Sequence, residues 1–404
     1  MTPGSKRPSK SKPANQLKRS ARVREKISPN RVRGFVRGVF WQDMHAARVQ
    51  SVANGVIGVV HCAALAIHAI GQAYAQCAGI KAKSGVTQID RLLSNEKLDL
   101  DRVLRCWVRF VVGGRPELLL AMDWTEFDAD KHSTLAVYLV TRHGRATPLA
   151  WRTVLKSELK GNQKRYEYEM VERLHTWLDP NKRITLLADR GFGDQKLYEY
   201  LGFLGWDYVI RFRGQIHVTD SKGVTRTARQ WVPPSGRAKM LKNARVTCDL
   251  FEVPAAVVVW DKKMKEPWCL ATSLACRTAS TIVKNYGRRF SIEETFRDQK
   301  DQHFGMGLKA THIKSPDRRD RLLLLVAQAQ ALLTLLGAAA ERCGLDRFLK
   351  ANTVKYRTHS LYRQGLYWYG AIPNAPDEWL MPLMKAFDEV IREHRDLCEI
   401  LGVL

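Results

Sequence analysis

Apolar residues recur along this chain with two different spacings, and the change between them separates three regions. Between residues 38 and 112 they recur every three to four positions, the spacing of α-helices. The helices expected there are Trp41–Ala47, Val52–Ile70, Val86–Leu93 and Leu100–Val112, with a break at Gly79. The helical spacing returns after Arg318, over Leu322–Ala340, Leu361–Tyr369 and Asp377–Leu401. Helical regions are therefore expected on both sides of a central one.

The central region, from Glu117 onward, has short apolar runs that are typical of buried strands. The expected strands are Leu118–Trp124, Thr134–Val140, Ala146–Leu155, Ile184–Asp189 and Tyr208–Arg213, and the expected helices are Gln163–Leu178 and Gln195–Leu204. This β-β-β-α-β-α-β order predicts an α/β fold, in which a mixed sheet carries helices on its faces.

A long segment follows the fifth expected strand. It holds about seventy residues, far more than a connection between two elements needs. Further strands are expected within it, at Ile216–Thr219, Ala244–Cys248, Val253–Trp260 and Trp268–Ser273. The sequence thus predicts a β-rich insertion, which carries Trp231, Trp260 and Trp268. A tryptophan in a strand is most often part of a core.

Two of the expected strands end in an aspartate, Asp123 after Leu118–Met122 and Asp189 after Ile184–Ala188. Burial of an isolated carboxylate is costly, so such a group is paired, neutralised or bound to a metal ion. Each aspartate alone has a plain alternative, which is to cap the turn after its strand.

A third carboxylate, Glu293, lies among Tyr286, Arg289 and Lys300. The spacing Y-x2-R-x3-E-x6-K places all four side chains on one stripe of a single helix. A solvated face with i,i+4 ion pairs has the same composition. With Asp123 and Asp189, however, Glu293 completes three oxygen donors suited to a hard divalent cation. Asp298 and other nearby acidic residues fall off this stripe, and Glu126 is expected on the opposite face of its strand.

The charge of the chain predicts a polyanionic partner. Lysine and arginine number 66 against 40 acidic residues, a formal net charge of +26. Residues 1–37 hold twelve of the cations and one acid, Glu25. Such an arm is expected to be disordered and to bind DNA without sequence preference, or only to solubilise the chain.

The segment Gly85–Arg91 suits the start of a DNA recognition helix, and a plain helical bundle fits it nearly as well. Val52–Ile70 is apolar but is interrupted by Asn54, His61 and His68, so a buried helix is expected there and no membrane span. The eight cysteines are scattered and show no C-x-x-C spacing, which fits a reducing cytoplasm.

Asp123, Asp189 and Glu293, the last within its Tyr286, Arg289 and Lys300 frame, resemble the active-site residues of the DDE transposases of bacterial insertion sequences. The subgroup is the insertion-sequence-four type, which is named for its YREK signature. The neighbouring residues agree: Asp123-Trp124-Thr125 resembles the D-x-T of the family, and Ala188-Asp189-Arg190-Gly191-Phe192 resembles its A-D-x-G-F/Y. The resemblance covers Glu117 to Leu308. It implies a ribonuclease-H-like core, in which the first and fourth strands are neighbours, with a β-rich insertion before the glutamate helix.

The resemblance also implies a function. Asp123, Asp189 and Glu293 would hold two Mg²⁺ ions, with Mn²⁺ as a substitute, and would cleave transposon ends and join the 3′-OH to target DNA. Cut-and-paste transposition through a hairpin intermediate is expected. Tyr286, Arg289 and Lys300 would hold phosphates, and Trp260 or Trp268 would stack on a flipped base. The alternatives are an endonuclease without strand transfer and a domesticated protein that only binds DNA.

The expected partners are double-stranded DNA, as transposon ends and target, and a second copy of the chain in a homodimeric synaptic complex. The expected location is the bacterial cytoplasm, at the nucleoid. The expected domains are a basic disordered arm (1–37), a helical DNA-binding domain (38–112), a catalytic core in two parts (113–212 and 276–317), the β-rich insertion (213–275) and a C-terminal helical region (318–404).

Overall fold

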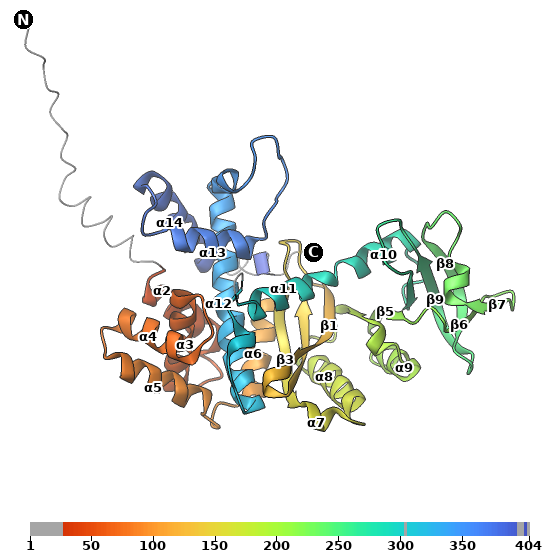
Figure 1. The fold of residues 1–404 in the computed structure, drawn as a ribbon, viewed down its shortest axis with the longest axis horizontal. Coiled ribbons are helices and arrows are strands. Elements are labelled where there is room, and N and C mark those ends of the chain that lie inside the picture. The colour runs from red at the N-terminus through yellow and green to blue at the C-terminus, as the bar shows by residue number, and fades with distance from the viewer. Residues whose placement is uncertain (1–26, 303–304, 394–399, 402–404) are drawn as a thin grey trace, which may run out of the picture.

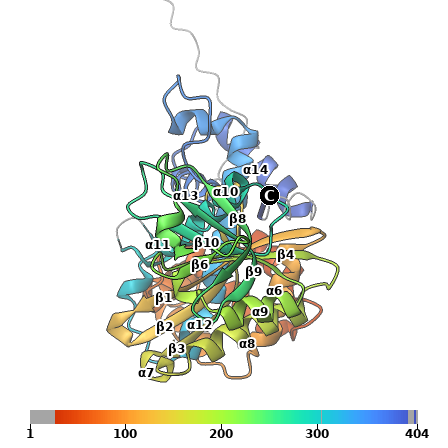
Figure 2. The same ribbon diagram turned by 90° about the vertical axis from the view of Figure 1, so that its right-hand side faces the viewer.

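The structure, a computed structural model, describes residues 27–302, 305–393 and 400–401. One mixed sheet runs through the middle of the molecule, with N-terminal helices at one end and the insertion strands at the other (Figures 1 and 2). The ten strands lie in the order β3-β2-β1-β4-β5-β10-β9-β8-β6-β7. This mixed sheet flanked by helices is consistent with the predicted ribonuclease-H-like transposase fold, and the predicted α/β class is confirmed.

The core strands agree with their predicted positions to within about three residues at each end. The core elements are β1 (Glu117–Phe127), β2 (His132–Leu139), β3 (Thr147–Leu155), α7 (Lys156–Leu159), α8 (Gln163–Trp177), β4 (Arg183–Ala188), α9 (Gln195–Phe203) and β5 (Asp207–Phe212). Helices pack on both faces of the sheet, so residues 118–122 of β1 are all buried. Continuous burial of this kind explains why the strand reads as an unbroken apolar run.

The predicted insertion continues the core sheet. Its strands are β6 (His217–Thr219), β7 (Thr225–Thr227), β8 (Lys239–Val246), β9 (Phe251–Val259) and β10 (Trp268–Thr272). The last of them, β10, pairs antiparallel with β5, with Cys269 opposite Phe212. The insertion is therefore attached to the core sheet by backbone hydrogen bonds.

The N-terminal region differs from the predicted helices in three places. Its helices are α2 (Pro29–Phe40), α3 (Ala46–Cys62), α4 (Ile67–Ala78), α5 (Ala82–Leu93) and α6 (Leu100–Val112). The predicted disordered arm is wrong for residues 29–37, which lie in α2 because Val32, Phe35, Val36 and Val39 form a buried face; residues 1–26 lie outside the described part. Residues 41–44 form a turn where a helix was expected.

Val52–Ile70 also is not one helix. Ala63 ends α3 in the left-handed conformation with φ +50°, and α4 leaves at an angle of 100° to α3. The break at Gly79 is where the sequence predicted it, because glycine adopts the left-handed φ of +65° without strain.

The last helices enclose the sheet. They are α10 (Ala279–Gly287), α11 (Phe290–Lys300), α12 (Pro316–Arg342), α13 (Leu361–Ala371) and α14 (Asp377–Arg392). Helix α12 is long and apolar enough to cross a membrane, yet its whole apolar window is buried in the protein. It contacts α3, α13, α14 and β3, and thus acts as the central helix of the core (Figure 1).

Candidate active site

The parallel pairing of β1 with β4 brings the two predicted aspartates to the same end of the sheet. Met122 is opposite Ala188 in this pair, and Asp123 and Asp189 each follow by one residue. Oδ1 of Asp123 accepts a hydrogen bond from the backbone N–H of Trp124 at 2.9 Å. Oδ1 of Asp189 accepts one from the N–H of Gly191 at 2.8 Å, so this aspartate also caps the turn after its strand. Asp189 therefore does cap the turn, as the alternative predicted. The cap uses Oδ1, so Oδ2 can still bind a cation.

The stripe of Tyr286, Arg289, Glu293 and Lys300 spans two helices, and the predicted single helix is wrong. Tyr286 lies near the end of α10, and Arg289 is the N-cap residue of α11. Arg288 and Arg289 both keep helical backbone angles, so the second helix continues in nearly the direction of the first (Figure 1). The residues consequently still share one side.

Arg289 connects two of the three predicted carboxylates. Its Nη1 lies 3.0 Å from Oδ2 of Asp123 and its Nη2 lies 2.6 Å from Oε1 of Glu293. The Arg289 side chain is only 6% exposed, against 46% for Glu293. Two donors of one planar guanidinium, directed at separate carboxylates, set the positions of both acids.

Negative charge is concentrated around Arg289. The pKa of Asp123 is raised to about 6: burial is the largest cause, the charges of Asp189 and Glu293 act in the same direction, and Arg289 opposes them. Burial alone would lower the pKa of Arg289, but Tyr286, Asp123, Glu293 and Asp189 together raise it. All three carboxylates are therefore close enough to act electrostatically on this arginine. Carboxylates that repel one another in a partly dry site favour a bound cation.

Lys300, at the other end of α11, reaches the same strand as Asp123. Its Nζ donates to Oγ1 of Thr125 at 3.0 Å and to the carbonyl oxygen of Glu126 at 2.7 Å. The side chain of Glu126 points the other way and pairs with Lys156 at 2.7 Å, as its place in the strand predicted. Helix α11 is thus attached to β1 by Arg289 at its first turn and by Lys300 at its last.

The two predicted tryptophans are in different surroundings. The ring of Trp268 is 5.0 Å from that of Tyr286 and is stacked on Phe290 at 5.7 Å. Trp260 is 38% exposed, bonds through Nε1 to the carbonyl of Met264, and has the guanidinium of Arg229 5.0 Å above its ring. The contacts described for Trp260 lie within the insertion. Of the two tryptophans, Trp268 is therefore the one that contacts a residue of the stripe, Tyr286.

Sequence reasoning missed a group of cations beside this site. A cavity of about 570 Å³ between β5 and the insertion is lined by Arg190, Arg211, Arg213, Arg229 and Glu266, among others. Glu266 pairs with both Arg190, at 3.2 Å, and Arg211, at 2.8 Å. Arg190 could have been predicted from the sequence as a residue near the site, because it directly follows Asp189. Arg211 lies on β5, and no pattern in the sequence marks it.

A family comparison agrees with this geometry. The model of the transposase DDE domain matches residues 114–332, which is more than half of the 404 residues. The chain belongs to the DDE transposase family. No match is found among curated proteins. The matched range contains all three predicted carboxylates, and membership implies that this transposase acts on DNA.

The carboxylates of this transposase fit a divalent cation in their chemistry, since they offer hard oxygen donors and repel one another. Their present arrangement is not a closed ion site: within the described ranges, no three His, Cys, Asp or Glu side chains are grouped to hold a metal ion. The physical reason is the Arg289 guanidinium, which lies between Asp123 and Glu293 and bonds to both.

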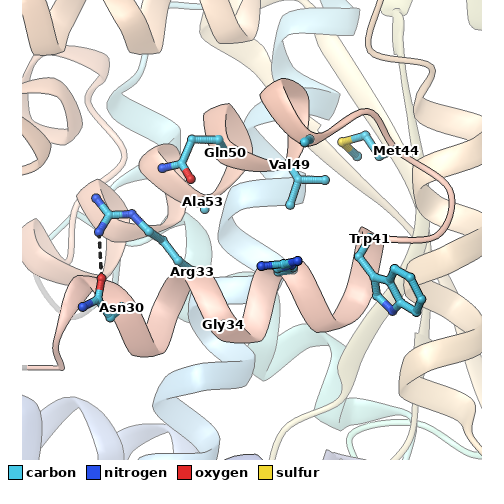
Figure 3. Close-up of a pocket in the computed structure, with 10 residues that line it drawn as sticks. Asn30, Arg33, Gly34, Trp41, Met44, Val49, Gln50 and Ala53 are labelled. Carbon is cyan, nitrogen blue, oxygen red and sulfur yellow. Dashed lines mark hydrogen bonds between the residues drawn. The ribbon is translucent and has the colours of Figure 1, made fainter.

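The N-terminal helices of the transposase offer two surfaces for DNA. On α5, the predicted recognition helix, Thr87, Gln88 and Arg91 are exposed, while Gly85 is buried against the backbone of Gly71. Between α2 and α3 lies a groove of about 580 Å³ that is lined by Arg33, Arg37 and the exposed Trp41, together with small and apolar residues (Figure 3). DNA binding by either surface remains a prediction.

Proposed function

We propose that this protein is the transposase of a bacterial insertion sequence of the YREK type, and that it cleaves transposon ends and joins their 3′-OH to target DNA. The observation that supports this most directly is the meeting of Asp123 and Glu293 at Arg289, with Asp189 beside them. These residues come from β1, the end of β4 and α11, far apart in sequence, and the YREK spacing is complete.

Asp123, Asp189 and Glu293 would hold two Mg²⁺ ions, for which Mn²⁺ substitutes. The bound ions would supply activation of water and stabilisation of the leaving 3′ oxygen. Arg289, which in the described conformation neutralises Asp123 and Glu293, would transfer its hydrogen bonds to phosphate oxygens when DNA binds. This exchange would leave the carboxylate oxygens available to cations.

Of the remaining residues of the stripe, Lys300 would contact the DNA strand. Tyr286 is fully buried, so its predicted phosphate contact is replaced by an indirect role. Lys300 would neutralise a phosphate near Thr125, and Tyr286 would support Trp268 from below. Trp268 is our candidate for stacking on a flipped base, because its partners Tyr286 and Phe290 fix its ring beside Arg289. Trp260 is a second, more distant candidate. Such a base-binding site suits the hairpin intermediate of cut-and-paste transposition.

The partners that follow are double-stranded DNA and a second copy of the chain, which pairs the two ends as a homodimer at the nucleoid of a bacterial cytoplasm. The domains that we propose keep the sequence boundaries, with α2 moved from the arm into the helical DNA-binding region. Residues 113–212 and 276–317 then form one catalytic unit with the insertion strands at its edge.

The test begins with the DNA that flanks the gene, where inverted repeats bordered by a short target duplication are expected. A duplex of that repeat, incubated with the purified protein, Mg²⁺ and a target plasmid, should be cleaved and joined. Asp123→Asn, Asp189→Asn and Glu293→Gln should each abolish cleavage and retain binding to the duplex. Glu126→Gln is the matched control, because its side chain lies on the opposite face of β1.

Each other result points to another function. Nicked duplex without joined product would indicate an endonuclease. Binding without cleavage by the wild type would indicate a domesticated DNA-binding protein. Cleavage by all three carboxylate variants would refute the metal site.

A further inference from the structure

The face of α11 that points away from the candidate active site carries a fully buried carboxylate. Asp298 has no exposed surface, and it lies five residues after Glu293 on the same helix. The stripe that selected the YREK residues excludes it. Burial of an ionised carboxylate costs several kcal/mol unless its oxygens are paired, so the partners of Asp298 are informative.

Two arginines that are far apart in sequence pair with Asp298. Nε of Arg145, in the turn between β2 and β3, lies 2.5 Å from Oδ2. Nη2 of Arg363, on α13, lies 2.8 Å from Oδ1. The guanidinium of Arg145 also comes within 3.7 Å of Glu294. Asp298 is thus held from both sides, once by the core sheet and once by the C-terminal helices.

Backbone contacts reinforce the same face of α11. The N–H of Ala146, next to Arg145, donates to Oγ1 of Thr295 at 3.0 Å, and this hydroxyl donates back to the carbonyl of Ala146 at 3.0 Å. One helical turn further, Gln299 accepts from the hydroxyl of Tyr138 at 3.1 Å and donates to Gln330 of α12 at 2.9 Å. These bonds oppose both rotation and sliding of the helix.

In the described part of the chain, the hydrogen bonds from the front of α11 to β1 come from Arg289 and Lys300, and both residues would give up these bonds to DNA in the proposed function. The contacts on the opposite face of α11, at Thr295, Asp298 and Gln299, must then keep Glu293 in place. We infer that Asp298 is a positioning residue, which holds the glutamate helix against the sheet through Arg145 and Arg363 while the front contacts exchange. The inference rests on the proposed role of Glu293.

A consequence concerns the part of the chain outside the family match. Arg363 follows residue 332, where the match ends, yet it forms an ion pair with Asp298 of the glutamate helix. Helix α13 packs tightly on α12 through Gly337 and Gly365, so Arg363 has a rigid support. The C-terminal helices therefore complete the catalytic unit.

The test compares Asp298→Asn with the wild type in single-turnover cleavage of the terminal-repeat duplex. A displaced catalytic group costs up to roughly 100-fold in rate. We expect the cleavage rate to fall by about 10- to 100-fold, while the Kd for the duplex stays within about twofold of the wild type. Asp320→Asn is the control, since Asp320 is a buried carboxylate that contacts Thr153 and not α11.

A double variant separates position from stability. Asp298→Asn leaves the partly buried Arg363 guanidinium without this charge partner and leaves Arg145 with Glu294, which lowers Tm. Adding Arg363→Gln removes one of these charges, so Tm should recover in part while the cleavage rate stays low. Recovery of the rate together with Tm would show a merely structural role and overturn the inference, as would an equal rate loss in Asp320→Asn.

If Asp298→Asn does not fold, Arg363→Lys takes its place. It keeps the charge and loses the planar guanidinium, and a several-fold slower cleavage with unchanged Kd is expected; a wild-type rate would overturn the inference. The proposed function fails separately, namely if Glu293→Gln cleaves like the wild type. If Glu293→Gln is inactive and Asp298→Asn cleaves normally, only the positioning role is lost.

Discussion

Arg289 lies 3.0 Å from Asp123 although the two residues are 166 positions apart in sequence, and the same guanidinium bonds to Glu293. One cation thus balances two acids that a transposase is expected to offer to metal ions. The guanidinium of Arg289 and a divalent cation cannot both occupy the space between Asp123 and Glu293. Binding of metal and binding of DNA are therefore expected to be coupled through this side chain.

This coupling gives the first prediction. Arg289→Gln removes the competing charge, so Mn²⁺ should bind the DNA-free protein several-fold more tightly, as measured by calorimetry or by electron paramagnetic resonance. Cleavage of the terminal-repeat duplex should fall at the same time. Arg297→Gln serves as the control, because this exposed arginine pairs with Glu294 and not with Glu293. Unchanged or weaker Mn²⁺ binding in Arg289→Gln would contradict the competition.

A second prediction concerns pH. Burial raises the pKa of Asp320 to about 6, although hydrogen bonds from Thr153 oppose the shift. Between about pH 4 and pH 6 the folded protein then binds a proton that the unfolded chain has released, so the contribution of Asp320 to stability falls as the pH rises through this window.

Asp320→Asn should abolish that contribution. Each unit of pKa shift corresponds to about 1.4 kcal/mol, so the stability of the variant relative to the wild type should be higher at pH 7.5 than at pH 4 by up to about 3 kcal/mol. Urea unfolding at both pH values measures this difference. A constant offset between the two proteins would show that Asp320 keeps an ordinary pKa.

The third prediction separates the two tryptophans. Trp268→Ala removes the ring that contacts Tyr286 and Phe290, and base stacking contributes roughly 1–3 kcal/mol. Cleavage that requires a flipped base should therefore fall by roughly 10-fold or more. Trp260→Ala, in the same insertion but with contacts to Arg229 and Met264, should cleave nearly normally. If Trp260→Ala lost cleavage and Trp268→Ala kept it, the stacking role would belong to Trp260.

The fourth prediction concerns the crossing of α12 and α13. A Cβ added at Gly337 would lie 1.9 Å from the carbonyl oxygen of Leu361, which is backbone and cannot move aside alone. Gly337→Ala should lower the free energy of unfolding by more than about 2 kcal/mol, in the range of overpacked cores. Gly34→Ala in α2 is the matched control.

At Gly34 an added Cβ meets nothing within 4 Å. Since alanine favours a helix over glycine by about 1 kcal/mol, this control should be as stable as the wild type or slightly more so. Urea unfolding of both variants measures the difference. Equal stability of Gly337→Ala and the wild type would mean that the two helices are less closely packed than the structure shows.

The sequence by itself determined the order of strands and helices along the core, and it placed Asp123 and Asp189 at the ends of two apolar runs. Apolar runs mark strands that are covered on both faces, and an aspartate that ends such a run lies where this cover ends. For Asp189 that point follows β4, and for Asp123 it lies within β1, which continues to Phe127. The sequence also indicated α6 with its boundaries and four of the five insertion strands; β7 was missed, and β8 begins at Lys239 where the prediction began at Ala244. It did not lead to α2, because the many lysines and arginines of residues 1–37 are typical of a disordered arm, although Val32, Phe35, Val36, Val39 and Phe40 recur at helical spacing.

Only the tertiary structure decided which charges meet. Helical periodicity gives the face on which Arg289 and Asp298 lie, but not what packs against that face. The partners Asp123, Arg145 and Arg363 come from strand β1, a turn and a C-terminal helix, and no local spacing connects them to α11. Packing of distant elements placed an arginine between two acids at the front of the helix and a buried carboxylate between two arginines at the back.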